Sequence, residues 1–279
     1  LIKLHPYGAL FPKERIVEMG VATAKGMGLD PTAGGKIIID IEERPKKDAR
    51  AFCAWVKIPD EVYLVTMPAG GPYDIMVFLH EYGHAQHAAN IPPGWPVEFA
   101  RIGDNSVTEA YAMTFDHLIL NESWLREIAG IDDPAPFIRA EAMTGLIGLR
   151  RYAAKIAHEV ALHEEGAGAD LEAARERYAA LHKRALGFPC PDTPYLFDVD
   201  PHFYSVRYIR AWHLEAILSE TLADKHGEAW FQSEGAGDFL RELWGMGQKE
   251  DADEIARRLG KPGLDVSALV RRVKRPFQA

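Results

Sequence analysis

Two histidines and a glutamate in the segment His80-Glu81-Tyr82-Gly83-His84 form an HExxH pattern, in which one helix presents two metal ligands with a carboxylate beside them. Positions four apart in an α-helix lie about 40° apart around the axis and one turn apart along it, so His80 and His84 can share one ion. A catalytic zinc ion takes three protein ligands and keeps a further position for water, whose pKa it lowers to about 7. Glu81 can act as the base toward that water without ligating the ion.

The residues around this motif predict a buried helix. The run from Ile75 to Leu79 is apolar on every side, which is typical of an interior helix. Pro72 suits a first turn and Pro92 prevents continuation, so about five turns are expected between them. The alternative is an exposed helix with two surface histidines and a solvated glutamate.

Glu109 is the candidate third ligand, 25 positions after His84. The proline break leaves room for a loop and a second helix that runs back past the first. Asp116 lies two turns beyond Glu109 on the same face, where it could orient a ligating imidazole. Two alternatives remain open: Ser106 and Glu109 also match a capping box, and Asp116 could be a solvated helix residue.

These residues resemble the zinc oligopeptidases of the thimet oligopeptidase and oligoendopeptidase F type, known as peptidase family M3. The family pattern is HExGHxxH followed, after an interval of 24 residues, by a glutamate ligand. It is matched here by His80, Glu81, Gly83, His84, His87 and Glu109.

The resemblance implies a fold, a cofactor and an activity. The expected fold is mainly α-helical, a zincin-like domain of the gluzincin class with a small antiparallel β-sheet beside the HExxH helix. One Zn²⁺ per chain is expected on His80, His84 and Glu109, with Glu81 as general base. The implied activity is hydrolysis of peptide bonds in short peptides.

The family also carries a late tyrosine-rich segment that closes over the substrate, and the segment from His202 to Tyr208 is similar to it. Tyr204 and Tyr208 keep the family spacing, but the third tyrosine is Ala211 here. The resemblance therefore leaves Tyr204, Tyr208 and His202 as alternative donors to the oxyanion.

In zinc peptidases of this architecture an edge strand pairs with the extended substrate. The segment Val62 to Thr66 is expected to have this role, unless the sheet merely covers the zinc helix.

Periodicity predicts the remaining elements. Residues 1–130 are expected to hold the sheet and zinc-binding helices, and residues 131–279 a helical lobe with the tyrosine segment. Strands are predicted at 36–41, 51–57 and 62–66, helices at 12–27, 137–165, 171–186, 204–226 and 238–259, and an irregular connection at 187–201.

Two other groups of reactive residues are set aside. His158 and His163 are five apart, about 140° around a helix, so they cannot chelate one ion, and with Glu159 they are predicted at the surface. Cys53 and Cys190 have no neighbouring signature of a cysteine nucleophile.

Composition limits the partners. A formal net charge of −9 and a pI near 5.7 disfavour nucleic acid and anionic membranes. No run reaches the roughly 18 apolar residues of a membrane span, and two distant cysteines give no disulfide framework, so a cytoplasmic setting is expected.

The chain of 279 residues resembles only the C-terminal catalytic half of the family, whose members are about twice as long. A missing N-terminal half, a separate chain or a homodimer could complete the substrate channel, or the cleft could be more open. Two other functions stay open: a catalytically inactive zincin-like binding or scaffold protein, and a hydrolase acting on another carbonyl.

Overall fold

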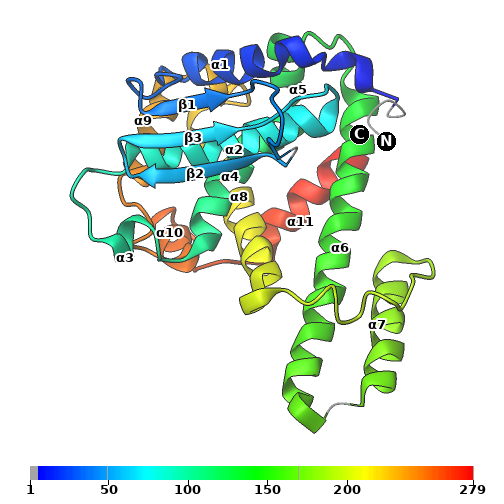
Figure 1. Ribbon diagram of the computed structural model, residues 1–279. Coiled ribbons are helices and arrows are strands. Elements are labelled where there is room, and N and C mark those ends of the chain that lie inside the picture. The colour runs from blue at the N-terminus through cyan, green and yellow to red at the C-terminus, as the bar shows by residue number, and fades with distance from the viewer. Residues whose placement is uncertain (1–5, 49, 169, 279) are drawn as a thin grey trace. The chain divides into compact units, whose positions relative to one another are not determined.

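The computed structural model describes residues 6–48, 50–168 and 170–278, and the chain divides into two compact units. The first comprises Leu1–Ile138 and Ala211–Ala279, and the second Arg139–Arg210. Both consist mainly of helices, and the first also contains a three-stranded sheet (Figure 1). The chain leaves the first unit after Ile138 and returns to it at Ala211. The division into a sheet-bearing part and a helical lobe at residue 130 stays a prediction.

The sheet consists of β1 (Ile37–Asp40), β2 (Phe52–Lys57) and β3 (Glu61–Val65), in the order β1-β3-β2. β2 and β3 pair antiparallel across a short turn, as predicted. β1 and β3 pair parallel, so the prediction of a wholly antiparallel sheet is wrong for this pair. After β1 the chain crosses to the opposite edge of the sheet and forms β2 there. It then turns back as β3, which lies between β2 and β1 and runs in the same direction as β1.

The segment Val62 to Thr66 is not an edge strand. Val62 is in register with Ile37 on one side and with Trp55 on the other, so β3 is hydrogen-bonded along both sides. A strand with two neighbours has no free edge for an extended substrate. The predicted substrate-pairing role of this segment is therefore wrong, and β1 and β2 form the edges.

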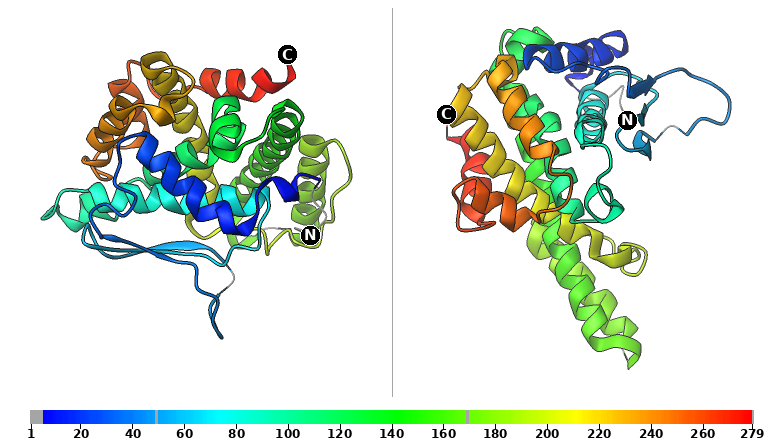
Figure 2. Two further views of the ribbon diagram at one scale, coloured as in Figure 1. Left: turned by 90° about the horizontal axis from the view of Figure 1, so that it is seen from above. Right: turned by 90° about the vertical axis from the view of Figure 1, so that its left-hand side faces the viewer.

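The HExxH helix is α2 (Pro72–Asn90), which begins and ends where the two prolines predicted. The sheet packs on it through Ile37 and Val62 against Ala85, Ala88 and Ala89. Three alanines on one face let the strands approach the helix closely. Figure 2 (left) shows the sheet as an outer layer of the first unit with helices on one of its faces.

The predicted helix at 238–259 is two helices. The chain leaves helical geometry at Gly247, whose φ is +59°. A Cβ there would meet the Phe99 carbonyl oxygen at 2.5 Å, so packing against another segment decides the break.

The helices at 12–27, 137–165, 171–186 and 204–226 are confirmed, whereas three further helices were not predicted. The observed helices are α1 (Ile16–Gly26), α3 (Val97–Ala100), α4 (Asn105–Asp116), α5 (Glu122–Trp124), α6 (Ala135–Glu165), α7 (Leu171–Leu186), α8 (Tyr204–His226), α9 (Glu234–Trp244), α10 (Ala252–Arg258) and α11 (Val266–Lys274).

An aromatic core joins three helices of the first unit. Phe78 and Tyr82 of α2 stack with ring centroids 5.7 Å apart. Phe115 of α4 meets the Tyr82 ring edge-on at 6.1 Å and contacts Trp244 of α9 at the same separation. All four rings are fully or almost fully buried. This core fixes α4 against α2, which matters because α4 carries Glu109.

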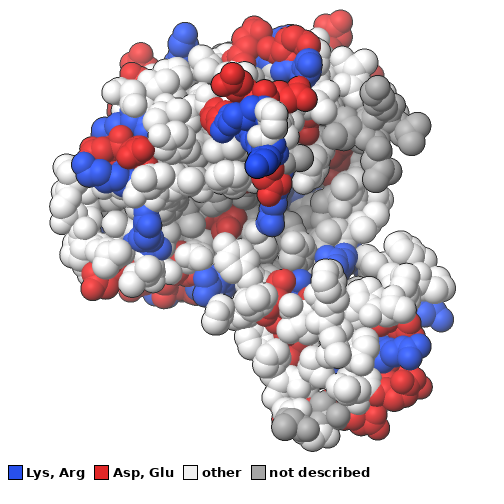
Figure 3. Space-filling model, in the orientation of Figure 1, with Lys and Arg blue, Asp and Glu red and all other residues white. Residues whose placement is uncertain are grey.

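One face of the molecule carries charged side chains of both signs. On the face shown in Figure 3, Lys and Arg side chains lie among Asp and Glu and form no extended basic area there. Among the described residues, no helix combines the length and apolar character that a membrane span requires. The exclusion of nucleic acid as a partner stays a prediction.

Gly83 sets the separation between α2 and α4. A Cβ at this position would meet the Ala112 Cα at 2.7 Å and the Tyr111 carbonyl oxygen at 3.0 Å. The backbones of the two helices therefore touch one turn from Glu109, and only a residue without a side chain fits between them.

Replacing Gly83 with alanine should force α4 away from α2 and lower the free energy of unfolding by about 1–3 kcal/mol. Urea denaturation of the metal-free protein measures this loss. Gly145→Ala is the matched control, because a Cβ there meets nothing within 4 Å and the helical position favours alanine by up to about 1 kcal/mol. Equal losses in the two variants would contradict the close approach.

Candidate metal centre

The structure brings His80, His84 and Glu109 together. The Glu109 Oε2 atom lies 3.3 Å from His80 Nε2 and 3.6 Å from His84 Nε2. Two atoms that each lie about 2.1 Å from a tetrahedral zinc ion are separated by about 3.4 Å, so these spacings fit such an ion. In the part of the chain that the structure describes, no other His, Cys, Asp and Glu side chains form such a group.

Glu109 comes from inside α4, not from a capping box. The N-cap of α4 is Asp104, whose side chain accepts a hydrogen bond from the Ser106 backbone N–H. Ser106 is itself buried in the first turn, so the capping-box alternative is wrong. The Glu109 side chain is 6% exposed and faces the two imidazoles.

Each imidazole is held at its other nitrogen by a side chain of α4. His80 Nδ1 lies 2.8 Å from Asp116 Oδ2, and His84 Nδ1 lies 2.9 Å from Thr108 Oγ1. Asp116 is buried, which contradicts the alternative of a solvated residue. Such contacts fix the ring orientation and tautomer of a ligating histidine. The contact of Thr108 was not predicted, although its place next to Glu109 on the helix gives a signal for it.

The charges of the metal-free site are arranged for a cation. Burial by itself would lower the pKa of His80, but hydrogen bonds with Asp116 and Glu109 outweigh it and raise the pKa to about 10. Burial would raise the pKa of Glu109, yet hydrogen bonds from His80 and His84 bring that pKa well below its usual range. The positive charge of a protonated His80 therefore offsets the negative charges of Asp116 and Glu109. A divalent cation would do the same, so protons and metal ions compete for this site.

Glu81 follows His80 on α2 and is half-buried. Its negative charge reaches the thiol of Cys53 on β2: burial, and after it the charge of Glu81, raise the pKa of Cys53 above its usual range. Cys53 therefore stays protonated, which supports setting it aside as a nucleophile. The carboxylate of Glu81 is the base nearest in sequence to the metal ligands.

The predicted oxyanion donors lie in the second unit. The rings of Tyr204 and Tyr208 meet edge-on with centroids 5.1 Å apart, and the Arg207 guanidinium lies over the Tyr204 ring. His202 and Phe203 both have left-handed φ angles, +59° and +54°, a conformation that costs free energy in residues other than glycine. The roles of Tyr204, Tyr208 and His202 stay predictions.

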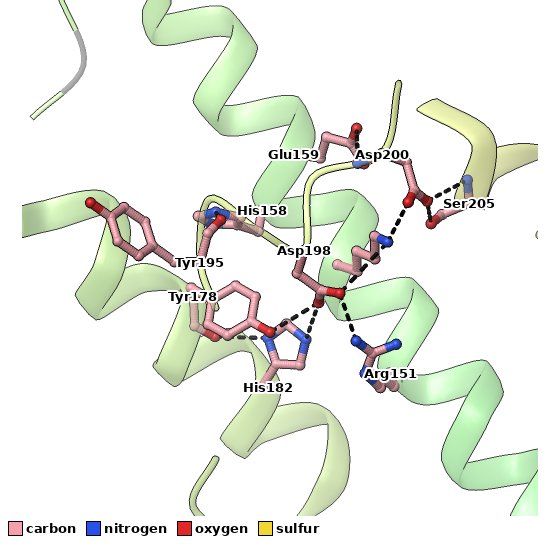
Figure 4. A network of polar contacts seen from close by, with 10 residues as sticks. Arg151, His158, Glu159, Tyr178, His182, Tyr195, Asp198, Asp200 and Ser205 are labelled. Carbon is pink, nitrogen blue, oxygen red and sulfur yellow. Dashed lines mark hydrogen bonds and ion pairs between the residues drawn. The ribbon is translucent and has the colours of Figure 1, made fainter. Parts of the chain in front are cut away.

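The connection before these tyrosines is irregular, as predicted, and polar contacts hold it in place (Figure 4). Asp200 accepts hydrogen bonds from the backbone and hydroxyl of Ser205 and pairs with Lys155 at 2.7 Å. Glu159 of α6 accepts from the Asp200 backbone N–H at 3.1 Å. These contacts hold the chain just before α8 against α6.

The same contacts correct a prediction about α6. His158 and Glu159, expected at the surface, are 2% and 0% exposed, whereas His163 is exposed as predicted. His158 Nε2 lies 2.9 Å from the Tyr195 carbonyl oxygen. The connection after α7 covers this part of α6, and such a long-range contact leaves no mark in the local sequence.

Comparisons with known proteins identify the fold. No protein-family model and no curated protein matches the chain. Metallocarboxypeptidase 1 of Trypanosoma cruzi has 17% sequence identity and a TM-score of 0.67, and the match covers 96% of this chain and 59% of that one. An M32 carboxypeptidase from Deinococcus radiodurans R1 has 16% identity and a TM-score of 0.71, with 98% and 61% covered.

At these identities the likeness establishes the fold alone. The predicted mainly helical, zincin-like fold with a small sheet is confirmed. One of these two structures is described as a metallocarboxypeptidase and the other as an M32 carboxypeptidase, so a relation to family M3 in particular is not confirmed. The chain spans about three fifths of the length of these structures.

Asp116→Asn should weaken zinc binding, because it removes the negative charge at His80 Nδ1 and keeps the side-chain shape. The dissociation constant should rise about 10–100-fold in competition with a chelating dye. Asp60→Asn is the control, since Asp60 is half-exposed and pairs with Lys57. Unchanged affinity in Asp116→Asn would contradict an orienting role.

Proposed function

We propose that this protein is a zinc-dependent peptidase that acts on short peptides. The observation that carries the proposal is the placement of three ligand atoms, from His80, His84 and Glu109, at the separations that tetrahedral zinc requires. The HExxH pattern supports it by placing Glu81 beside the site. The likeness in fold to metallocarboxypeptidases over nearly the whole chain supports it independently.

In the proposed reaction, His80, His84 and Glu109 hold the ion. When bound, zinc supplies Lewis acidity for the scissile carbonyl and makes a water molecule acidic near neutral pH. Glu81 accepts a proton from that water and returns it to the nitrogen of the leaving amine. One proton is taken and one given back, so Glu81 ends the cycle as a carboxylate.

Two further groups of residues complete the proposed mechanism. Asp116 keeps His80 Nε2 directed toward the ion through its bond to Nδ1. Tyr204, Tyr208 or His202 donates a hydrogen bond to the carbonyl oxygen as negative charge develops on it. This second role is carried over from the resemblance to the M3 oligopeptidases.

Glu81→Gln should retain zinc and lose about 10²–10⁴-fold in kcat/KM on a quenched peptide library, because the amide cannot accept the proton. Zinc content by atomic absorption is measured on the same samples. Glu98→Gln, at an exposed position on α3, is the control and should match the parent. Full activity in Glu81→Gln would exclude this residue as the base.

Two finer activities are compatible with the site. The M3-like motif favours internal cleavage by an oligopeptidase, whereas the overall fold resembles proteins described as carboxypeptidases. We favour removal of C-terminal residues, because the likeness in fold extends over nearly the whole chain and the motif over a few residues. A carboxypeptidase must recognise the terminal carboxylate, and charge-assisted hydrogen bonds to it are worth about 1.5–3 kcal/mol.

Peptides with a free C-terminus should therefore be shortened at least about tenfold faster than the same peptides with a C-terminal amide. Mass spectrometry of timed digests shows both the rate and the position of cleavage. Internal cleavage at equal rates for both forms would instead identify an oligopeptidase.

The alternative of an inactive zincin-like binding or scaffold protein is tested by the same samples. Zinc bound to the parent and to Glu81→Gln, with no cleavage by either, would favour it. The presence of Glu81 beside the ligands argues against it, since a structural metal has no use for a base.

A further inference from the structure

Thr108 contacts two histidines with one hydroxyl group. Its Oγ1 atom lies 2.9 Å from His84 Nδ1 and 3.1 Å from His87 Nδ1. Among the described residues these two nitrogens are the hydrogen-bond partners found for this hydroxyl. His84 is a proposed metal ligand, whereas His87 is one turn further along α2 and takes no part in the mechanism above.

The protons in this group can be assigned from the chemistry of the hydroxyl. A neutral histidine that binds a metal through Nε2 carries its proton on Nδ1, so His84 donates to Thr108 Oγ1. The single hydroxyl proton of Thr108 is then available for His87 Nδ1, which must accept it. If His87 Nδ1 carried a proton, the hydroxyl would face two N–H donors, and its own proton would have no acceptor.

The surroundings of His87 suit a neutral acceptor. The ring is fully buried and lies at a steep angle to the rings of Trp55 and Tyr111, with centroids 5.5 Å and 4.9 Å away. Burial lowers the pKa of His87 to about 3, and His84 adds to this lowering when its own ring is protonated. A smaller contribution from the Gly247 backbone opposes this lowering. Nε2 is buried and has no hydrogen-bond partner among the described residues.

We infer that Thr108 and His87 are positioning residues for the metal ligand His84. The chain of hydrogen bonds runs from His84 Nδ1–H to Thr108 Oγ1 and from the Thr108 hydroxyl to His87 Nδ1. It holds the His84 ring with Nε2 toward the ion and permits one tautomer only. The inference rests on the proposed zinc site. It adds a neutral group, Thr108 with His87, that orients the ligand His84, whereas the ligand His80 is oriented by the carboxylate of Asp116.

The test is the zinc dissociation constant of Thr108→Val, measured by competition with a chelating dye. Valine keeps the shape of threonine and removes the hydroxyl, so the constant should rise about 10–100-fold. Thr108→Ser restores a hydroxyl and should stay within about threefold of the parent. Thr114→Val is the matched control: Thr114 is also buried on α4, but its hydroxyl donates to the Ala110 carbonyl at 2.8 Å.

Thermal unfolding of the metal-free variants separates positioning from stability. Thr108→Val and Thr114→Val should lose similar amounts of stability, whereas only Thr108→Val should lose zinc affinity. His87→Leu should weaken zinc binding in the parent and have no further effect in Thr108→Val, because His87 acts through the hydroxyl.

Each outcome bears on a different claim. Zinc affinity in Thr108→Val equal to that in Thr114→Val would overturn this inference and leave the zinc site intact. Additive effects of His87→Leu and Thr108→Val would overturn the order of the hydrogen-bond chain. A parent protein that binds no zinc would overturn the proposed function and this inference with it.

Discussion

The arrangement depends on the close contact between two helices. An ion can join His80, His84 and Glu109 only if the carboxylate from α4 lies between two imidazoles on neighbouring turns of α2. The contact of Gly83 with Ala112 permits this approach, and the buried rings of Phe78, Tyr82 and Phe115 hold it from the core side. The sheet supports α2 from another face through small residues.

Helix α4 supplies more of the site than the HExxH motif suggests. It carries the third ligand, Glu109, and both side chains that hold the imidazoles from behind, Thr108 and Asp116. Because the three residues share one rigid element, their relative positions follow from helix geometry. The supports differ in kind, since Asp116 is a carboxylate and Thr108 a neutral hydroxyl. The site therefore gains one negative charge behind His80 and none behind His84.

The sequence predicted those parts of the site and fold that depend on local spacing. The pairing of His80 with His84, the bounds of α2 and α7, and the position of Asp116 all follow from helical periodicity and proline placement. Features that depend on distant contacts were missed. The break between α9 and α10 follows from packing against Phe99, and the parallel pairing of β1 from the path of its connection. The burial of Glu159 depends on a loop some 40 residues away.

The most direct test of the central claim is X-ray absorption at the zinc edge on the protein loaded with one equivalent of zinc. Scattering from two imidazoles, with nitrogen and oxygen neighbours at about 2.0–2.2 Å, is the predicted result. A sulfur neighbour at about 2.3 Å, which would implicate Cys53, or a shell of oxygen atoms without imidazole scattering would contradict the assignment of His80, His84 and Glu109.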